Sequence, residues 1–298
     1  MEKLSGYICY QSDWFAIATE NRVAICDSAG RSLTSLALPS VAWRYVAGEP
    51  DGSTITAAGI LSPKASVLAV WKRQQNLWRM LWKKQIHGVV EALAYAEGVV
   101  ALCASDTLQL LRVGDSTQIS QVRLPQPMEC LHVGSHGVWL GSSRGELWRY
   151  HNQSLARVAK LGVGEVLCIG SHRNTVYAGS ADTLIHVYDI SASRITHRMV
   201  GHASEVVCIH VQSSQLLSAG VQGDLSLWKP ESHYPDYRVM HTGQNPSAIA
   251  PTAKNDACWA LLSEGVFQVD WTRQRATKRV SRQQIMLATQ TKTSIGGK

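Results

Sequence analysis

The sequence predicts an all-β protein made of seven similar units, each folding into a four-stranded antiparallel sheet. Short segments such as "TVYAGSA", "EVVCIHV" and "DLSLW" alternate with period two and are bounded by Gly, Ser, Asp or Asn. Such segments recur in a unit of about 40 residues, which is typical of repeat architectures. Of the 298 residues, 45% are hydrophobic and only 17% are charged, which favours a packed core over a disordered chain.

The spacing of the cysteines indicates the length of the repeat. Cys130, Cys168 and Cys208 occur in "MEC", "VLC" and "VVC", at spacings of 38 and 40 residues, and Cys9 in "YIC" lies close to three further periods before Cys130. A free cysteine packs as a small hydrophobe. No two cysteines form a C-x-x-C pair, so zinc and thioredoxin-like sites are not indicated. We therefore expect these thiols to face the core of each unit.

The clearest copies span 128–151, 165–190 and 205–230, and each reads as strand, turn, strand, turn, strand, with a fourth strand after it. All units together begin near residues 6, 41, 90, 128, 165, 205 and 246. Four-stranded units of this length bury their faces by stacking on neighbours, and radial stacking closes them into a ring. Residues 1–284 are therefore expected to form one propeller domain, with 285–298 as a C-terminal tail that is flexible or closes the ring.

Ring closure has two solutions at this stage. Either the short N-terminal piece "MEKLS" pairs with the last unit, or the outer strand of unit seven comes from "ATKRVSR" or "IMLATQT" near the C-terminus. The sequence favours neither.

The chain resembles the WD40-repeat family over essentially its whole length. Gly201-His202 resembles the Gly-His dipeptide of that family, and four dipeptides lie where the family has Trp-Asp: Tyr188-Asp189, Trp228-Lys229, Trp71-Lys72 and Cys26-Asp27. The resemblance implies a seven-bladed β-propeller that binds other proteins. It also implies structural roles inside the blades for Gly201, His202, Ser218, Trp228, Asp182, Tyr188 and Asp189.

In the family, a histidine, a turn aspartate, a hydroxyl residue and the tryptophan form a buried hydrogen-bonded set. Unit six has the histidine, hydroxyl and tryptophan, but Gln222 stands where the turn aspartate is expected. Unit five has Asp182 but "GVG" in place of Gly-His, and unit three has Asp106 with His87 as its histidine. The resemblance thus implies that the set is complete in no unit, so that apolar stacking mainly holds the ring.

Catalytic signatures are missing from the sequence. It contains no G-x-S-x-G, Walker A, H-E-x-x-H or G-x-G-x-x-G motif. His132 and His136 have a spacing that converges on a helix but not across a strand and turn. We therefore expect no enzyme activity, no cofactor, no metal and no small-molecule substrate.

Tryptophans and cations interleave between Val70 and His87, and this segment contains no acid. Aromatic and basic side chains together can stack bases and hold phosphates, so Arg79, Lys83 and Lys84 are candidate contacts for RNA or an acidic partner. The alternative is a pair of ordinary strands with snorkelling cations. On strict alternation, Leu77, Arg79 and Leu81 would share one strand face, and Trp78, Met80 and Trp82 the other.

The chain has 29 basic and 22 acidic residues, a net charge of +7. Seven of the basic residues and none of the acidic ones follow Trp271, so the net charge comes from the C-terminal end. This end is either a solvated tail or a charged surface for nucleic acid or an acidic protein. Its candidate contacts are Arg273, Arg275, Lys278, Arg279 and Arg282.

Glu91, Glu165 and Glu205 each stand just before the first strand of a unit. In the family that point lies near the mouth of the central channel, where three carboxylates would favour a Lys- or Arg-bearing partner. The alternative is that they are solvated rim residues.

The resulting prediction is a non-catalytic scaffold or adaptor subunit that binds proteins within a larger complex. The first alternative is an RNA-associated subunit that uses the 71–84 edge and the basic end. The second is a ubiquitin-ligase substrate receptor, whose Trp-Asp-x-Arg signature is not met, because Tyr188-Asp189 is followed by Ile190-Ser191. Without a signal-peptide pattern or a membrane-length apolar run, an intracellular location in cytoplasm or nucleus and no membrane insertion are expected.

Overall fold

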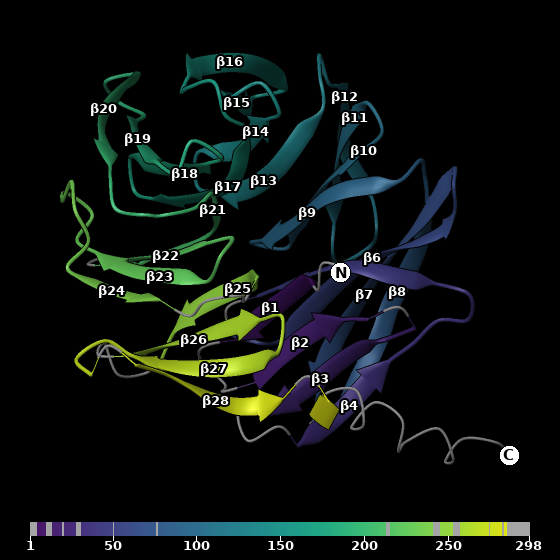
Figure 1. Ribbon diagram of the computed structural model, residues 1–298. Coiled ribbons are helices and arrows are strands. Elements are labelled where there is room, and N and C mark those ends of the chain that lie inside the picture. Colours follow the sequence, from purple (N-terminus) through teal and green to yellow (C-terminus); the bar gives the residue numbers. More distant parts are fainter. Residues whose placement is uncertain are drawn as a thin grey trace, which may run out of the picture.

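A computed structural model describes residues 5–9, 14–19, 21–27, 31–49, 51–75, 77–212, 215–240, 245–252, 257–273, 275–281 and 283–284. These residues form seven sheets of four antiparallel strands each, arranged around a centre (Figure 1). The predicted all-β seven-bladed propeller is therefore confirmed. Each blade is a meander, in which strands that follow one another in the chain are neighbours in the sheet.

Blade one comprises β1 (Ser5–Cys9), β2 (Trp14–Ala18), β3 (Val23–Asp27) and β4 (Ser32–Leu36). Blade two comprises β5 (Ala42–Gly48), β6 (Thr54–Ser62), β7 (Ala65–Gln74) and β8 (Leu77–His87). Blade three comprises β9 (Val90–Ala96), β10 (Val99–Ala104), β11 (Thr107–Arg112) and β12 (Gln118–Arg123). Blades four and five comprise β13 (Met128–Gly134), β14 (Gly137–Ser142), β15 (Glu146–His151) and β16 (Ser154–Lys160); and β17 (Val166–His172), β18 (Thr175–Ser180), β19 (Ile185–Asp189) and β20 (Arg194–Met199). Blades six and seven comprise β21 (Val206–Val211), β22 (Leu216–Gly220), β23 (Asp224–Trp228) and β24 (Tyr237–Met240); and β25 (Pro246–Pro251), β26 (Ala257–Leu262), β27 (Gly265–Asp270) and β28 (Arg275–Ser281).

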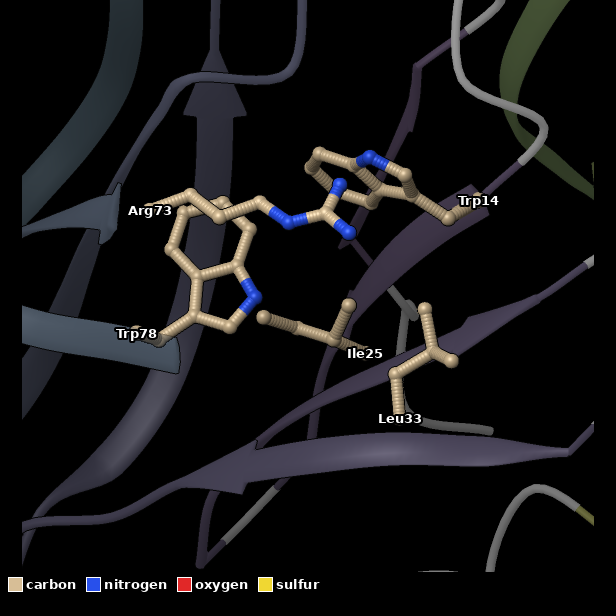
Figure 2. A pocket seen from close by; sticks show the side chains of 5 residues that line it. All are labelled: Trp14, Ile25, Leu33, Arg73 and Trp78. Atoms are coloured by element: carbon tan, nitrogen blue, oxygen red, sulfur yellow. The ribbon is translucent and has the colours of Figure 1, made fainter. Parts of the chain in front are cut away.

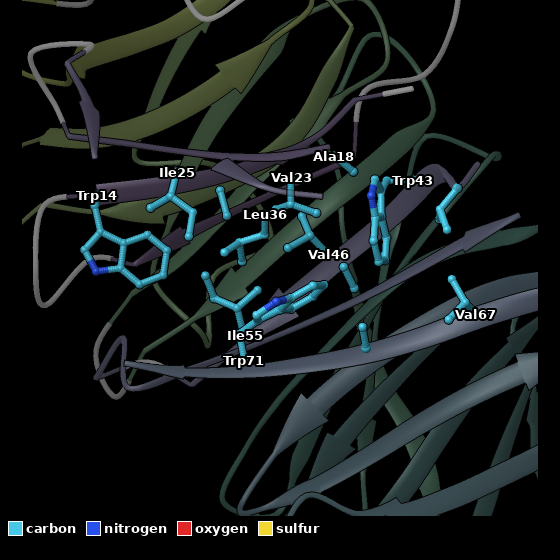
Figure 3. Close-up of a cluster of buried hydrophobic side chains, with 14 residues drawn as sticks. Trp14, Ala18, Val23, Ile25, Leu36, Trp43, Val46, Ile55, Val67 and Trp71 are labelled. Carbon is cyan, nitrogen blue, oxygen red and sulfur yellow. The ribbon is translucent and has the colours of Figure 1, made fainter. Parts of the chain in front are cut away.

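Seven apolar clusters hold the ring together, one at each junction between neighbouring blades. Figure 3 shows the cluster between blades one and two, where Trp43 and Trp71 meet edge to face with ring centroids 5.5 Å apart. Burial of apolar area stabilises such interfaces by roughly 25 cal/mol per Å². The middle strands are therefore buried on both faces, which explains why they are apolar without a clean alternation.

The ring closes by face-to-face packing. Phe15 and Ile17 of the first blade pack with Leu261 and Val280 of the last. The outer strand of blade seven is β28, so of the two closures left open by the sequence, "ATKRVSR" provides this strand and no described strand is exchanged between the first and last blades. The tail predicted at 285–298 lies outside the described residues.

The first strand of each blade lies at the ring centre and contacts the first strands of both neighbours. In blades two to seven this strand carries a β-bulge near its beginning, with one unpaired residue that the pairing register skips. These residues are Arg44, Glu91, Glu129, Leu167, Val207 and Ser247. Equivalent side chains of successive blades are therefore presented at one end of the central channel.

The cysteine repeat has a physical cause in the blade junctions. The Sγ of Cys130 donates to the carbonyl of Val166 in the next blade at 3.2 Å, and the Sγ of Cys168 donates to the carbonyl of Val206 at 3.4 Å. A small donor at this position thus bridges adjacent blades.

The most deeply buried cysteines are expected to resist alkylation in the folded protein. Burial and the charge of Asp27 raise the pKa of the Cys26 thiol to about 12. Burial and the charge of Glu91 raise the pKa of the Cys103 thiol to about 12. Burial also raises the pKa of the Cys258 thiol. Because the thiolate is the nucleophile, iodoacetamide near neutral pH should leave these three sites unmodified. Peptide mass spectrometry of native and urea-unfolded protein checks this, and rapid labelling of all three in the native protein would contradict it.

In the part of the chain that the structure describes, no helix has the length and apolar character needed to cross a membrane.

Candidate functional site

Blade six contains a complete buried hydrogen-bonded set. The indole Nε1 of Trp228 donates to Ser218 Oγ at 2.7 Å, and Ser218 Oγ lies 2.5 Å from His202 Nε2. The other ring nitrogen, Nδ1, lies 2.5 Å from a carboxylate oxygen of Asp224. The proton assignment that satisfies every group has Ser218 donating to His202 and His202 donating to Asp224. The same carboxylate accepts from Ser204 Oγ at 2.6 Å.

The aspartate of this set was assigned to the wrong position by the sequence. Gln222 is exposed in the turn, whereas Asp224, two residues later, opens β23 and has a fully buried side chain. Burial raises the pKa of Asp224, but hydrogen bonds from His202 and Ser204 outweigh this, so that its pKa lies below the ordinary value. The expectation that the set is complete in no blade is therefore wrong.

Blade five replaces the set with a shorter pair. Asp182 lies in the turn before β19 and accepts from Nε2 of His186, which comes from β19 itself, at 2.9 Å. Gly162 occupies the loop position equivalent to His202, and a Cβ there would lie 2.5 Å from the Asp182 carboxylate. The absence of a side chain at Gly162 thus leaves room for the Asp182 carboxylate and for His186 beside it.

The remaining predicted blade residues have local structural contacts. Tyr188 is buried and meets Trp139 of blade four with ring centroids 6.0 Å apart, and Asp189 accepts the backbone N–H of Ala192 in the following turn. Gly201 lies where a Cβ would approach Pro235 to 2.7 Å. In blade three, Asp106 is exposed and pairs with Arg123 at 3.1 Å, and His87 is exposed, so these two candidate members do not form a buried pair.

One end of the central channel carries a pair of glutamates. Glu91 and Glu129 occupy the equivalent bulges of β9 and β13, and burial together with the charge of Glu129 raises the pKa of Glu91. Tyr45 of β5 lies in the field of both, so that burial and Glu91 raise its pKa, against the opposing effect of Arg44. We call Arg44, Tyr45, Glu91 and Glu129 the mouth cluster.

Glu91 does not occupy the position predicted for it. It is the second residue of β9, whereas Glu165 and Glu205 precede β17 and β21 and accept backbone N–H groups of Ala181 and Val221 through their carbonyls. Sequence reasoning missed Glu129, although "VEAL" and "MECL" place a glutamate at the same point of two units. The side chains of Glu165 and Glu205 are exposed at the loops that lead into the inner strands of blades five and six.

Two histidines belong to the inner strands β13 and β21, farther along each strand than the bulge. His132 of β13 lies 2.9 Å from Ser171 Oγ of the next blade, and burial lowers its pKa to about 4. Burial and the proximity of His132 lower the pKa of His210, on β21, to about 4. Both imidazoles are therefore neutral at physiological pH.

The outer strand of blade two is irregular in a way that the sequence did not reveal. β7 pairs with β8 through Trp71 opposite Met80 and Val70 opposite Trp82, so that Leu81 is an extra, bulged residue. Trp78 consequently packs on the junction with blade one, and Trp82 packs on the junction with blade three. The prediction that both tryptophans share one face of the strand is therefore wrong.

A pocket of about 300 Å³ opens beside β8, at the junction of blades one and two. Its lining comes from both blades and consists of Trp14, Ile25, Leu33, Arg73 and Trp78 (Figure 2). The indoles of Trp14 and Trp78 meet edge to face with centroids 5.5 Å apart, and the guanidinium of Arg73 points toward them.

Of the basic residues near the C-terminus, the structure describes Arg273, Arg275, Lys278 and Arg279, which belong to blade seven, and acceptors of the same blade engage three of them. Arg273 lies 3.7 Å from a carboxylate oxygen of Asp270, Lys278 lies 2.5 Å from Glu264, and Arg279 donates twice to Gln268. Arg275 opens β28 and is exposed. Arg282 lies outside the described residues.

The comparisons with known proteins bear on the fold. A computationally designed protein, Ika8, has a solved structure that matches with a TM-score of 0.69 over 89% of this chain and 83% of its own, at 14% sequence identity. At this identity the likeness shows the fold alone. No protein-family model and no curated protein matches the sequence. Among the described side chains, no three of His, Cys, Asp or Glu come together as a group that could hold a metal ion.

Proposed function

We propose that this chain is a divergent WD40-type propeller that acts as a non-catalytic scaffold and binds a basic segment of a partner protein at the mouth cluster. The observation that carries the proposal is the pair of glutamates on adjacent inner strands. Glu91 and Glu129 occupy equivalent bulges of two inner strands in contact, and partial burial together with the charge of Glu129 raises the pKa of Glu91. Preorganised like charges of this kind are relieved by a cation.

The surroundings of the pair support a protein partner. Glu165 and Glu205 extend the acidic character to the loops before β17 and β21. Arg44 lies on the blade-two side of the cluster and opposes the glutamates there, which favours approach of a basic segment over blades three to six. Electrostatic complementarity at such a site supplies specificity and a fast on-rate more than raw affinity.

The double substitution Glu91→Gln and Glu129→Gln is expected to abolish capture of the basic partner. The probe for direct binding is a synthetic peptide of alternating Arg and Gly, measured by fluorescence anisotropy at two salt concentrations. Affinity purification from the native cells with mass spectrometry, for wild type and variant in parallel, then identifies the partner. Thermal stability should equal or exceed that of wild type, because the substitution removes a repulsion.

Glu97→Gln with Glu231→Gln is the matched control, since both are exposed glutamates away from the mouth cluster. Unchanged peptide binding and unchanged capture by the mouth variant would exclude the channel mouth as the binding face. A separate variant with Glu165→Lys and Glu205→Lys tests how far around the ring the surface extends.

An RNA-associated propeller is the alternative function. The support for it comes from β8, where Arg79 and Lys83 are exposed. Blade seven adds little support, because most of its described cations already contact acceptors of the same blade. Salt-sensitive binding of an oligouridine RNA that is lost on charge reversal in β8 would favour this alternative over the scaffold.

A further inference from the structure

Blade two differs from the other blades in the length of its outer strand. β8 has eleven residues, whereas the outer strands of the other blades have four to seven. It is the end strand of its sheet, and no described strand pairs with its outer edge. Long free edges are a hazard that proteins usually blunt or cover, because their backbone N–H and C=O groups can pair with another chain.

The side chains of this edge combine exposed apolar groups with cations. Leu77 is 63% exposed, Met80 40% and Leu81 39%. Lys72 of β7 stands directly opposite Arg79 of β8, and like charges in that register are destabilising. In the part of the chain that the structure describes, no carboxylate lies within ion-pair distance of Lys72, Arg79, Lys83 or Lys84.

The pocket of Figure 2 lies at the same edge. Trp78 belongs to β8 and Arg73 to β7, while Leu33, on the other side of the opening, is 42% exposed. Its volume of about 300 Å³ is at the lower end of ligand pockets and suits one large side chain. The guanidinium of Arg73 lies beside the two indoles at the rim of this cavity (Figure 2).

We propose that β8 and this pocket form a docking surface for an extended acidic segment of a partner protein. The segment adds a strand to the free edge of β8, places its carboxylates near Lys72, Arg79, Lys83 and Lys84, and inserts one large apolar side chain into the pocket beside the Trp14–Trp78 pair. Backbone pairing supplies affinity in this mode and side-chain pockets supply specificity. This surface is separate from the mouth cluster and does not depend on the function proposed there.

Two observations favour a peptide over RNA at this edge. The exposed apolar side chains are aliphatic, and it is aromatic faces that stack with bases. The two tryptophans are committed to blade junctions: Trp82 Nε1 donates to the carbonyl of Val113 at 2.6 Å, and Trp78 packs against Trp14. The chain's own residues 285–298 are a poor occupant by charge, because they contain Lys292 and Lys298 and no acid.

The test uses the full chain and an array of short synthetic peptides, each with Glu and Asp on both sides of one variable central residue. Peptides with central Trp, Phe or Leu are expected to bind about tenfold more tightly than the peptide with central Ser, the equivalent of about 1.4 kcal/mol. N-methylation at alternate residues of the best peptide should abolish binding in one register and leave it intact in the other, because only one set of N–H groups faces β8.

Variants of the chain locate the surface. Arg79→Glu with Lys83→Glu should weaken the best peptide at least tenfold, and Leu33→Gln should remove the preference for a large central residue. The control for charge is Arg173→Glu with Arg194→Glu, two exposed cations of blade five. The Glu91→Gln and Glu129→Gln variant should bind the peptides like wild type, which separates this proposal from the function proposed for the channel mouth.

Each other outcome overturns the proposal. No binding of any acidic peptide removes the partner class, and binding of oligouridine RNA in its place assigns the edge to nucleic acid. Equal binding of the peptides with central Trp and central Ser removes the pocket from the site. Equal weakening by the blade-five control removes β8 as its location.

Discussion

Replacing Asp224 with alanine is expected to lower the free energy of unfolding by about 2–6 kcal/mol, because two buried donors lose their charged acceptor. The carboxylate is fully buried and accepts hydrogen bonds from His202 Nδ1, Ser204 Oγ and the backbone of Ala203. Its loss leaves the buried donors of His202 and Ser204 unsatisfied, each at a cost of roughly 1–3 kcal/mol, whereas Ala203 is exposed. Urea unfolding at pH 7, followed by tryptophan fluorescence, measures the difference.

The matched control is Gln222→Ala. The family pattern places the aspartate of the set at that position, but the side chain is exposed, so its truncation should change stability by less than about 0.5 kcal/mol. A large effect at Gln222 with a small effect at Asp224 would refute the arrangement described for blade six. Asp224→Asn is the informative intermediate, because it keeps the shape and removes the charge.

Acidification from pH 7 to about pH 5 is expected to destabilise the folded protein by on the order of 1–2 kcal/mol for each of His132 and His210. Burial, and for His210 the nearby His132, lowers the pKa of both imidazoles to about 4, below the ordinary value of 6.5. The unfolded chain therefore binds more protons than the folded chain between these values. The contribution of these two imidazoles to the free energy of unfolding is fully present above about pH 6.5 and is lost as the pH falls toward 4.

Chemical unfolding at several pH values measures this loss. The variant with His132→Gln and His210→Gln should show a shallower decline, because glutamine does not titrate, whereas His87→Gln, an exposed control, should follow wild type. Burial lowers the pKa of His186 and His197 as well, so that part of the decline persists in the double variant. A decline as steep in the double variant as in wild type would contradict the assignment.

The fold could be predicted because each unit repeats a physical requirement. Cys130 and Cys168 recur because a thiol at that point donates to the carbonyl of the next blade. The inner strands begin at Ala42, Val90, Met128, Val166, Val206 and Pro246, within one residue of the predicted starts. Period and turn residues were sufficient to place the strands because every blade is a local meander.

The candidate site was harder to predict from the sequence than the fold. Its geometry depends on β-bulges and on which of several nearby side chains occupies the same buried position. Alternation placed Trp78 and Trp82 on one face, but the bulge at Leu81 turns them to opposite junctions. Spacing led to Gln222, while the buried carboxylate is supplied by Asp224. His186 could not be expected from a loop pattern, since it enters from a strand into the room that Gly162 leaves.

The face-to-face closure of the ring bears on how the chain folds. Since every sheet consists only of sequence neighbours, each blade can form from contacts of low sequence separation, which favours rapid folding. The junction of blades one and seven is the exception, because it joins segments some 240 residues apart and bears the loop-closure entropy of the whole ring. We therefore expect this seam to form last and to open first. A circular permutant cut between blades four and five would move the chain ends away from the seam while leaving every sheet whole.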